Sequence, residues 1–199
     1  MSLSRPLQNR VDPFGALTVT SERGLLMGNR GGKFHNDDRT LGRRRWTSLH
    51  WIICRCLFKG RHREVWGGGY TELFFLDEPT ALAAGHRPCF ECRREDAKAF
   101  LAACNHSTAP ELDAVLNAER LEAGAKRLHR RPIDELPDGA MIVQDGEALA
   151  VRGDGLCPWS FNGYGAPRSR PRGLDVDVLT PPTSLAALSA GFAPLWAAM

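Results

Sequence analysis

Apolar and polar residues alternate with a period of two between Trp46 and Phe58, which predicts a β-strand. Cys54 and Cys56 fall on the same face of this predicted strand. Residues 70–76 are rich in aromatic and aliphatic side chains and predict a second strand. We therefore expect the two cysteines to lie within a sheet rather than in a surface loop.

The segment before these strands predicts further short strands joined by turns. Residues 16–20 have β-branched character, and the run Gly-Asn-Arg-Gly-Gly at 28–32 is typical of a turn. This run lacks the full spacing of the glycine motifs that bind nucleotides. The first half of the chain is expected to form a small antiparallel sheet.

Three helical patterns follow the strands. Asp77 and Pro79 are suited to the start of a short helix that Gly85 would end. Residues 92–104 have amphipathic spacing with acidic residues in the first turn, and residues 110–128 predict a third helix.

The pattern changes again from Pro137 onward. Short strand-like runs alternate with Asp-Gly and Gly-Asp turns, which predicts a β-rich region. The predicted strands are residues 140–143, 148–152, 156–161 and 174–179. Thr183 is expected to cap a final short helix that Gly191 ends.

Two close pairs of cysteines are the main chemical signal of the chain. Cys89 and Cys92 form a Cys-x-x-Cys motif, and Cys54 and Cys56 form the second pair. The chain has six cysteines and no secretory signal pattern after Met1, so we expect reduced thiols and a cytoplasmic protein. Paired cysteines in such a protein predict a tetrathiolate zinc site formed by these four residues.

Two alternatives to this ligand set remain open. Cys56 could be an ordinary buried thiol, with His62, His86 or His50 completing the site. The Cys89–Cys92 pair could also be redox-active, although no βαβ pattern precedes it.

Charge is distributed unevenly along the chain. Residues 1–63 carry 13 Lys and Arg against 4 Asp and Glu, whereas the remainder carries 13 against 19. A basic half of this kind predicts a surface for a polyanion such as nucleic acid, or packing against the acidic half. No apolar run is long enough to span a membrane. The predicted nucleic-acid-binding residues are Arg43, Arg44, Arg45, Lys59, Arg61 and Arg63.

The stretch from Ile53 to Asp96 resembles the zinc-binding N-terminal domain of Ada-type DNA repair proteins. The resemblance lies in Ile-Cys-Arg at 53–55, Glu-Leu-Phe-Phe at 72–75 and Ala-Leu-Ala-Ala-Gly-His-Arg-Pro-Cys-Phe-Glu-Cys-Arg at 81–93. In that family four cysteines bind zinc, and the first accepts a methyl group from a phosphotriester of the DNA backbone. The resemblance implies that Cys54 corresponds to this methyl acceptor.

The sequence departs from the family pattern at two positions. Only Arg55 separates Cys54 from Cys56, whereas the family has three residues between its first two cysteines, so Phe58 stands at the second position. His86 replaces a phenylalanine of the family motif. The predicted functions are therefore zinc binding with DNA or other nucleic-acid binding, methyl transfer to Cys54, or a purely structural zinc in an interaction protein.

These patterns together predict an α+β fold. It would consist of a small antiparallel sheet with a Cys-rich zinc knuckle, several helices and a β-rich C-terminal part. We place residues 1–106 in a basic part with the Ada-like module and residues 107–199 in a second part. A single continuous domain is the alternative.

Overall fold

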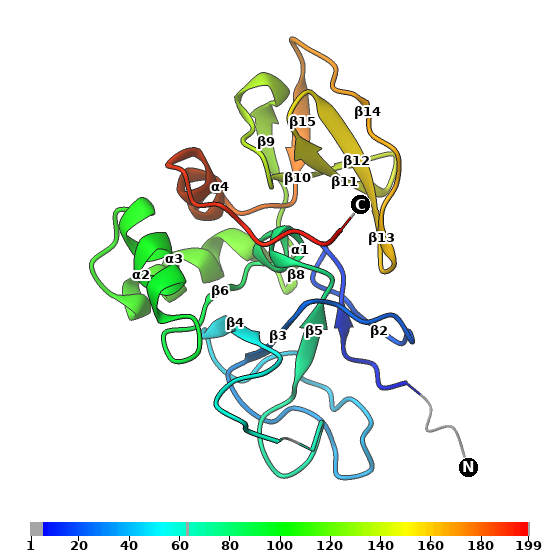
Figure 1. Ribbon diagram of the computed structural model, residues 1–199, viewed down its shortest axis with the longest axis vertical. Coiled ribbons are helices and arrows are strands. Elements are labelled where there is room, and N and C mark those ends of the chain that lie inside the picture. Colours follow the sequence, from blue (N-terminus) through cyan, green and yellow to red (C-terminus); the bar gives the residue numbers. More distant parts are fainter. Residues whose placement is uncertain (1–5, 63, 199) are drawn as a thin grey trace.

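The computed structural model describes residues 6–62 and 64–198. Two sheets lie at opposite ends of the molecule, with helices between them and along one side (Figure 1). The presence of both helices and several sheets is compatible with the predicted α+β class. No helix within the described residues is long and apolar enough to cross a membrane.

The first sheet has six strands in the order β2-β1-β5-β3-β4-β6. It is mixed rather than antiparallel, because β5 is parallel to β1 and β6 is parallel to β4. Both parallel pairs join strands that are distant in the chain, and parallel strands require such crossover connections. The strands are β1 (Arg10–Val11), β2 (Leu17–Thr18), β3 (Leu26–Arg30), β4 (Trp51–Arg55), β5 (Leu73–Phe75) and β6 (Arg87–Pro88).

The predicted turn at residues 28–32 is wrong for its first three positions, which belong to β3. This strand lies between β5 and β4, and a Cβ atom on Gly28 would lie 2.1 Å from the carbonyl oxygen of Ile52. Glycine is therefore present for close packing and not for a turn. The turn itself begins at Gly31, which has a φ of +102°.

Within the part of the chain that the structure describes, four α-helices pack between and beside the sheets. The short helix expected after Asp77 is confirmed. The Asp77 side chain accepts a hydrogen bond from the Thr80 backbone N–H and so caps that helix. Helix α3 ends at Arg120, earlier than predicted, because the chain turns into the hairpin β7 (Leu121–Glu122) and β8 (Ala125–Lys126). The helices are α1 (Glu78–Ala83), α2 (Arg94–Ala103), α3 (Ala109–Arg120) and α4 (Pro182–Ser189).

Thr183 does not cap α4 as predicted. The helix begins at Pro182 without a side-chain cap, and the Thr183 hydroxyl instead donates to Glu119 Oε1 at 2.8 Å. A backbone N–H of the same residue donates to Glu119 Oε2 at 2.9 Å. These bonds attach α4 to α3.

The predicted β-rich region forms a second sheet with the order β13-β12-β11-β10-β15-β9, and β14 pairs with β12. All its pairings are antiparallel. A short 3₁₀ helix, Ile133–Glu135, follows the strand of this sheet that comes first in the chain. The strands are β9 (His129–Pro132), β10 (Met141–Gln144), β11 (Glu147–Arg152), β12 (Gly155–Ser160), β13 (Gly163–Tyr164), β14 (Arg168–Ser169) and β15 (Asp175–Val178).

The largest hydrophobic core covers one face of the first sheet. Ile53 and Phe75 lie in it, and so do Leu112 and Leu116 of α3 and Leu188 of α4. Residues on both sides of position 106 therefore share one core. This core occupies only one face of the first sheet, which leaves the other face for a different set of side chains.

Candidate metal centre

Strand β4 presents Cys54 on the face of the first sheet that is turned away from the main core. Trp51 and Ile53 point to the core side, so the alternation of the strand places Ile52 and Cys54 on the opposite side. Cys54 pairs with Met27 of β3, and both are buried. The period of two in the sequence therefore identified the face correctly at this position.

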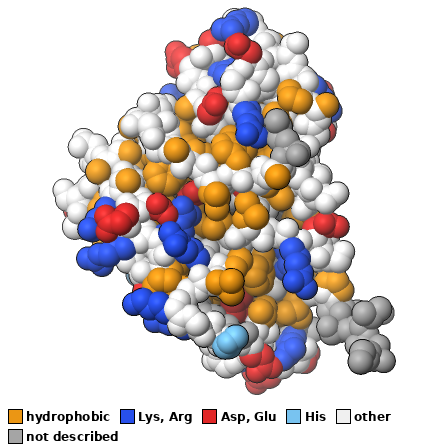
Figure 2. Space-filling view, viewed as in Figure 1, with side chains coloured by type: hydrophobic (Ala, Val, Ile, Leu, Met, Phe, Trp, Pro, Cys, Tyr) orange, Lys and Arg blue, Asp and Glu red, His pale blue; other side chains and the backbone are white. Residues whose placement is uncertain are grey.

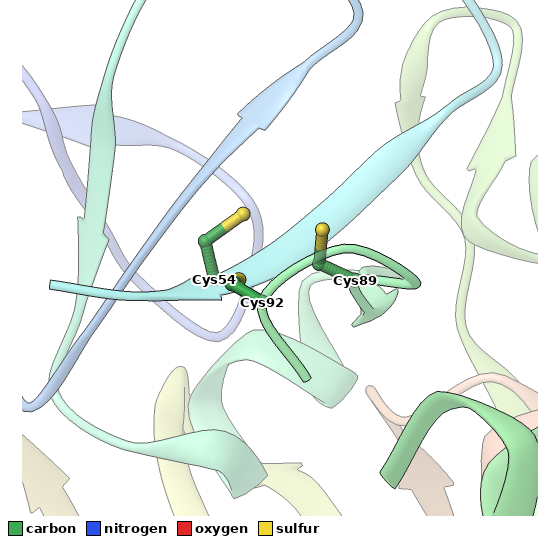
Figure 3. A group of neighbouring side chains, drawn as sticks. All are labelled: Cys54, Cys89 and Cys92. Carbon is green, nitrogen blue, oxygen red and sulfur yellow. The ribbon is translucent and has the colours of Figure 1, made fainter. Parts of the chain in front are cut away.

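Three cysteine sulfurs meet on this face. The Sγ atoms of Cys54, Cys89 and Cys92 all lie within 4.8 Å of one another, and their side chains converge in Figure 3. Cys54 and Cys89 are 8% and 6% exposed, whereas Cys92 is half-buried. Parallel pairing of β4 with β6 produces this meeting, because it sets Ile53 beside Pro88 and so brings Cys89 next to Cys54.

Backbone groups are aimed at two of the sulfurs. The Glu91 N–H donates to Cys89 Sγ at 3.3 Å, and the Arg55 N–H donates to Cys92 Sγ at 3.4 Å. The Cys89 N–H itself donates to the Ile53 carbonyl at 2.9 Å, which continues the β4–β6 ladder. Such N–H donors stabilise a thiolate, the form of cysteine that binds metal.

The three thiols also influence one another directly. Hydrogen bonds from Cys54 and Cys92 lower the pKa of Cys89, whereas the hydrogen bond with Cys89 raises the pKa of Cys54. Three thiolates this close would repel one another strongly unless a cation lay between them. Tetrahedral zinc with bonds of about 2.3 Å requires sulfurs roughly 3.8 Å apart. The observed grouping, at up to 4.8 Å, needs only a small contraction to bind a metal ion.

Two buried ion pairs hold the Cys89–Cys92 segment in place. Arg87 contacts both carboxylate oxygens of Asp113 in α3, at 2.8 and 2.7 Å. Arg93 contacts both oxygens of Glu78 in α1, at 2.6 and 3.0 Å. These fork-shaped contacts fix geometry as well as charge. The guanidinium groups of both arginines are therefore matched by carboxylates.

Cys56 is not part of the sulfur group. It lies just beyond the end of β4, is exposed, and its thiol donates to the Leu25 carbonyl at 3.4 Å. Its assignment as the fourth ligand stays a prediction.

The histidines considered as alternative ligands are placed elsewhere among the described residues. His86 is fully buried on the core side of the sheet, where its ring packs at 5.0 Å from Trp51 and 4.7 Å from Phe75. His50 is exposed, with Nε2 at 3.8 Å from Asp113. His62 is also exposed. None of the three joins the sulfur group.

The basic residues predicted to bind nucleic acid lie in two separate segments of the chain. Arg43, Arg44 and Arg45 are consecutive and exposed, and within the described residues they form no ion pair. Arg61 pairs with Glu91 of the cysteine segment at 2.7 Å. On the face drawn in Figure 2, Lys and Arg side chains flank a central apolar band in the half that contains the first sheet.

Lys59 is exposed, and its Nζ lies 5.2 Å from the ring centroid of Phe58. Arg63 lies outside the described residues. Arg61 therefore contacts the cysteine segment, whereas Lys59 contacts its neighbour Phe58.

A comparison of the chain with protein-family models, curated proteins and solved structures finds no match.

Sequence reasoning missed the carboxylates that anchor the site. Glu78 and Asp113 are buried and lie 15 and 26 positions from their arginine partners. The only local signal was the presence of Arg87 and Arg93 on either side of the cysteines.

Proposed function

We propose that this protein binds zinc through the thiolates of Cys54, Cys89 and Cys92. The observation that carries the proposal is the convergence of three sulfurs within 4.8 Å. Thiolate sulfur is a soft donor that favours zinc over hard cations such as magnesium or calcium. The backbone N–H donors to two of the sulfurs supply the supporting hydrogen bonds that metal ligands commonly receive.

Three thiolates leave one position of a tetrahedron to be filled. Cys56 is the first candidate, because only Arg55 separates it from Cys54 and it is exposed. To reach the ion it would have to release its contact with Leu25 and turn toward the other sulfurs. A water molecule or an external ligand is the alternative occupant, as in zinc sites that keep one position open.

Zinc content of the reduced protein tests the proposal. We expect about one zinc per chain, lost in Cys54→Ser, Cys89→Ser and Cys92→Ser, because each removes one thiolate of the tetrahedral set. Cys104→Ser is the matched control, since Cys104 lies against the main core and its thiol contacts the Thr183 carbonyl. Loss of zinc in Cys56→Ser would identify the fourth ligand. Absence of zinc from freshly reduced wild-type protein would contradict the proposal.

Binding of nucleic acid is a second candidate function, favoured by the exposed run Arg43, Arg44 and Arg45. Three adjacent guanidinium groups without carboxylate partners are suited to contact phosphates. A surface hollow of about 480 Å³ is lined by these arginines together with Trp46, Thr47 and Gly124. Affinity of this kind arises from release of counterions and falls as salt rises.

The double variant Arg43→Gln/Arg44→Gln is expected to weaken binding to random-sequence duplex DNA. If both residues contact phosphates, the slope of log affinity against log salt should decrease by about 2. Fluorescence anisotropy over a salt series measures this slope, and Lys98→Gln on α2 serves as a control for a lost surface charge. An unchanged slope would exclude the run from the interface. No binding at low salt would leave a structural zinc in an interaction protein as the better proposal.

Methyl transfer to Cys54 has weaker support from the geometry. Its side chain is 8% exposed and packs with Met27 and Cys89, beside Ile52 and Phe74. A phosphotriester would have to reach a sulfur that these neighbours cover. We therefore favour metal binding over a role for Cys54 as an alkyl acceptor.

A further inference from the structure

A cluster of cations surrounds a cavity on the other face of the first sheet from the sulfurs. Arg30 pairs with Trp51 across β3 and β4, on the same side as Ile53 and the main core. The cavity has a volume of about 360 Å³. Its lining includes the cationic residues Arg30, Arg45, Arg120 and Lys126 and the indole rings of Trp46 and Trp51.

Two of these cations are held rigidly against one indole ring. The Cζ atoms of Arg30 and Arg120 each lie 4.0 Å from the centroid of Trp51. Both arginines are almost fully buried, at 2% and 1% exposed. Cation–π contact partly compensates for lost hydration of a guanidinium, but it does not neutralise the charge.

The hydrogen bonds of Arg30 go to neutral acceptors. Its Nη2 donates to the Gly15 carbonyl at 2.8 Å, and its Nε donates to His86 Nε2 at 3.3 Å. Burial, together with the charges of Arg30 and Arg120, lowers the pKa of His86 well below its usual value. The imidazole is therefore a neutral acceptor that positions Arg30.

Arg120 is fixed in the same manner by neutral groups. It donates to the carbonyls of Gly85 and Leu49, at 3.1 and 3.0 Å, and to Asn117 Oδ1 at 3.1 Å. Gly85 has a φ of +85°, and a Cβ atom there would lie 2.6 Å from Arg120 Cβ. The positive φ and the close approach both require glycine at this position. Arg120 Nε and Trp51 Nε1 are both buried, and neither has a hydrogen-bond partner among the described residues.

No carboxylate neutralises this cluster among residues 6–62 and 64–198. Arg30, Arg120 and Lys126 form no ion pair there, and the Lys126 ammonium donates to the Ala83 carbonyl. Asp113 forms its ion pair with Arg87, and the Asp12 carboxylate accepts the Ala16 N–H; both carboxylates attract cations of the cluster through space without an ion pair to them. Buried charges are normally paired, so a cluster of cations without an ion pair is suited to bind an anion.

The cations of the cluster also repel one another. Burial first, and then neighbouring cations, lower the pKa of Arg30 to about 9 and the pKa of Lys126 to about 7, although the Asp12 carboxylate opposes both shifts. Burial likewise lowers the pKa of Arg120 to about 9. An anion bound among these groups would relieve both the desolvation and the repulsion.

We propose that this cavity binds the phosphate group of a ligand of nucleotide size. Guanidinium forks bind phosphate oxygens bidentately, and several converging cations suit a group with more than one negative charge. The volume falls at the lower end of the range for small-ligand sites. The hollow lined by the Arg43–Thr47 segment shares Arg45, Trp46 and Gly124 with the cavity, so the remainder of the ligand would extend there.

The site is independent of the metal centre, because the sheet separates the two. The phosphate could belong to a free mononucleotide or to the 5′ end of a nucleic-acid strand. Both carry a phosphate monoester, and the test below distinguishes them.

Calorimetry and thermal melting at constant ionic strength test the proposal with four probes. These are inorganic phosphate, AMP, and two otherwise identical single strands that end in a 5′-phosphate or a 5′-hydroxyl. We expect phosphate and AMP to raise the melting temperature above that in chloride, because a ligand specific for the folded state stabilises it. Tighter binding of the 5′-phosphorylated strand than of phosphate and AMP would assign the site to strand ends.

Variants locate the binding. Lys126→Met and Arg45→Gln should each weaken the tightest ligand at least about tenfold. Arg45 is exposed, so its substitution should not disturb folding. A loss of affinity in this variant would therefore report a lost contact with the ligand. Lys98→Met, on α2, should have no effect. The proposal is overturned if no probe stabilises the protein beyond chloride, or if both cavity variants retain wild-type affinity.

Discussion

Replacement of Cys89 with serine is expected to lower the stability of the zinc-loaded protein by at least about 3 kcal/mol. Structural zinc sites contribute roughly 10 to 16 kcal/mol where the unbound chain is unfolded. The effect should be smaller here, because two hydrophobic cores that contain none of the three cysteines also stabilise the fold. For a chain of this size each kcal/mol corresponds to a fall of about 2 to 4 °C in melting temperature. Thermal unfolding followed by circular dichroism, with zinc present, measures this change.

Removal of zinc from the wild type is the matched experiment for that variant. A chelator should lower the wild-type melting temperature to nearly the value of Cys89→Ser and should change the variant little, because both states lack the ion. Cys104→Ser should retain the full response to the chelator, since its thiol lies outside the sulfur group. If the chelator leaves the wild type unchanged, the metal does not stabilise this fold.

Glu78→Gln should reduce the free energy of unfolding by about 3 to 5 kcal/mol, the usual effect of breaking a buried ion pair. Glu78 is fully buried, and Arg93, its partner, is 7% exposed. The substitution preserves shape but leaves the Arg93 guanidinium with only the half-exposed Asp96 as a carboxylate partner. Glu78 Oε2 also accepts the Leu195 N–H at 3.0 Å, so the same change loosens the C-terminal segment. Urea unfolding monitored by tryptophan fluorescence measures the difference in the free energy of unfolding between the variant and the wild type.

A double-mutant cycle separates the ion pair from the other contacts of Glu78. Adding Arg93→Leu to Glu78→Gln should recover part of the lost stability, because no unpaired buried charge then remains. Glu95→Gln provides the surface comparison: Glu95 pairs with Lys98 in solvent, and its loss should have little effect. Equal effects of Glu78→Gln and Glu95→Gln would show that the buried pair adds nothing.

Local patterns in the sequence were sufficient for most individual elements. The short helix after Asp77 and four strands of the second sheet lie where capping residues, glycines and alternation predict them. Helix α3 ended early because the pair Ala123 and Gly124, with φ of +49° and +82°, turns the chain into a hairpin. The apolar spacing beyond Arg120 did not reveal this turn.

The metal ligands could be predicted only where a short stretch of sequence was enough to identify them. The spacing of Cys89 and Cys92 is visible in four residues, and alternation along one strand places Cys54 on a defined face. Cys56 shares that face only if the strand continues, and β4 ends at Arg55. The end of a strand depends on its neighbours in the sheet and is therefore not encoded in its own alternation.

The sequence alone thus determined the helical and strand segments and the presence of a cysteine-rich site, because capping, alternation and Cys-x-x-Cys spacing act over a few residues. Only the tertiary structure decided which sulfurs meet and which arginines lack a carboxylate. Parallel pairing of β4 with β6 brings Cys54 to Cys89, and the packing of α3 against the sheet brings Arg120 to Trp51. Arg30 fell within a predicted turn and proved to be buried. Contacts between segments so far apart depend on how the sheets and helices pack, which no local pattern specifies.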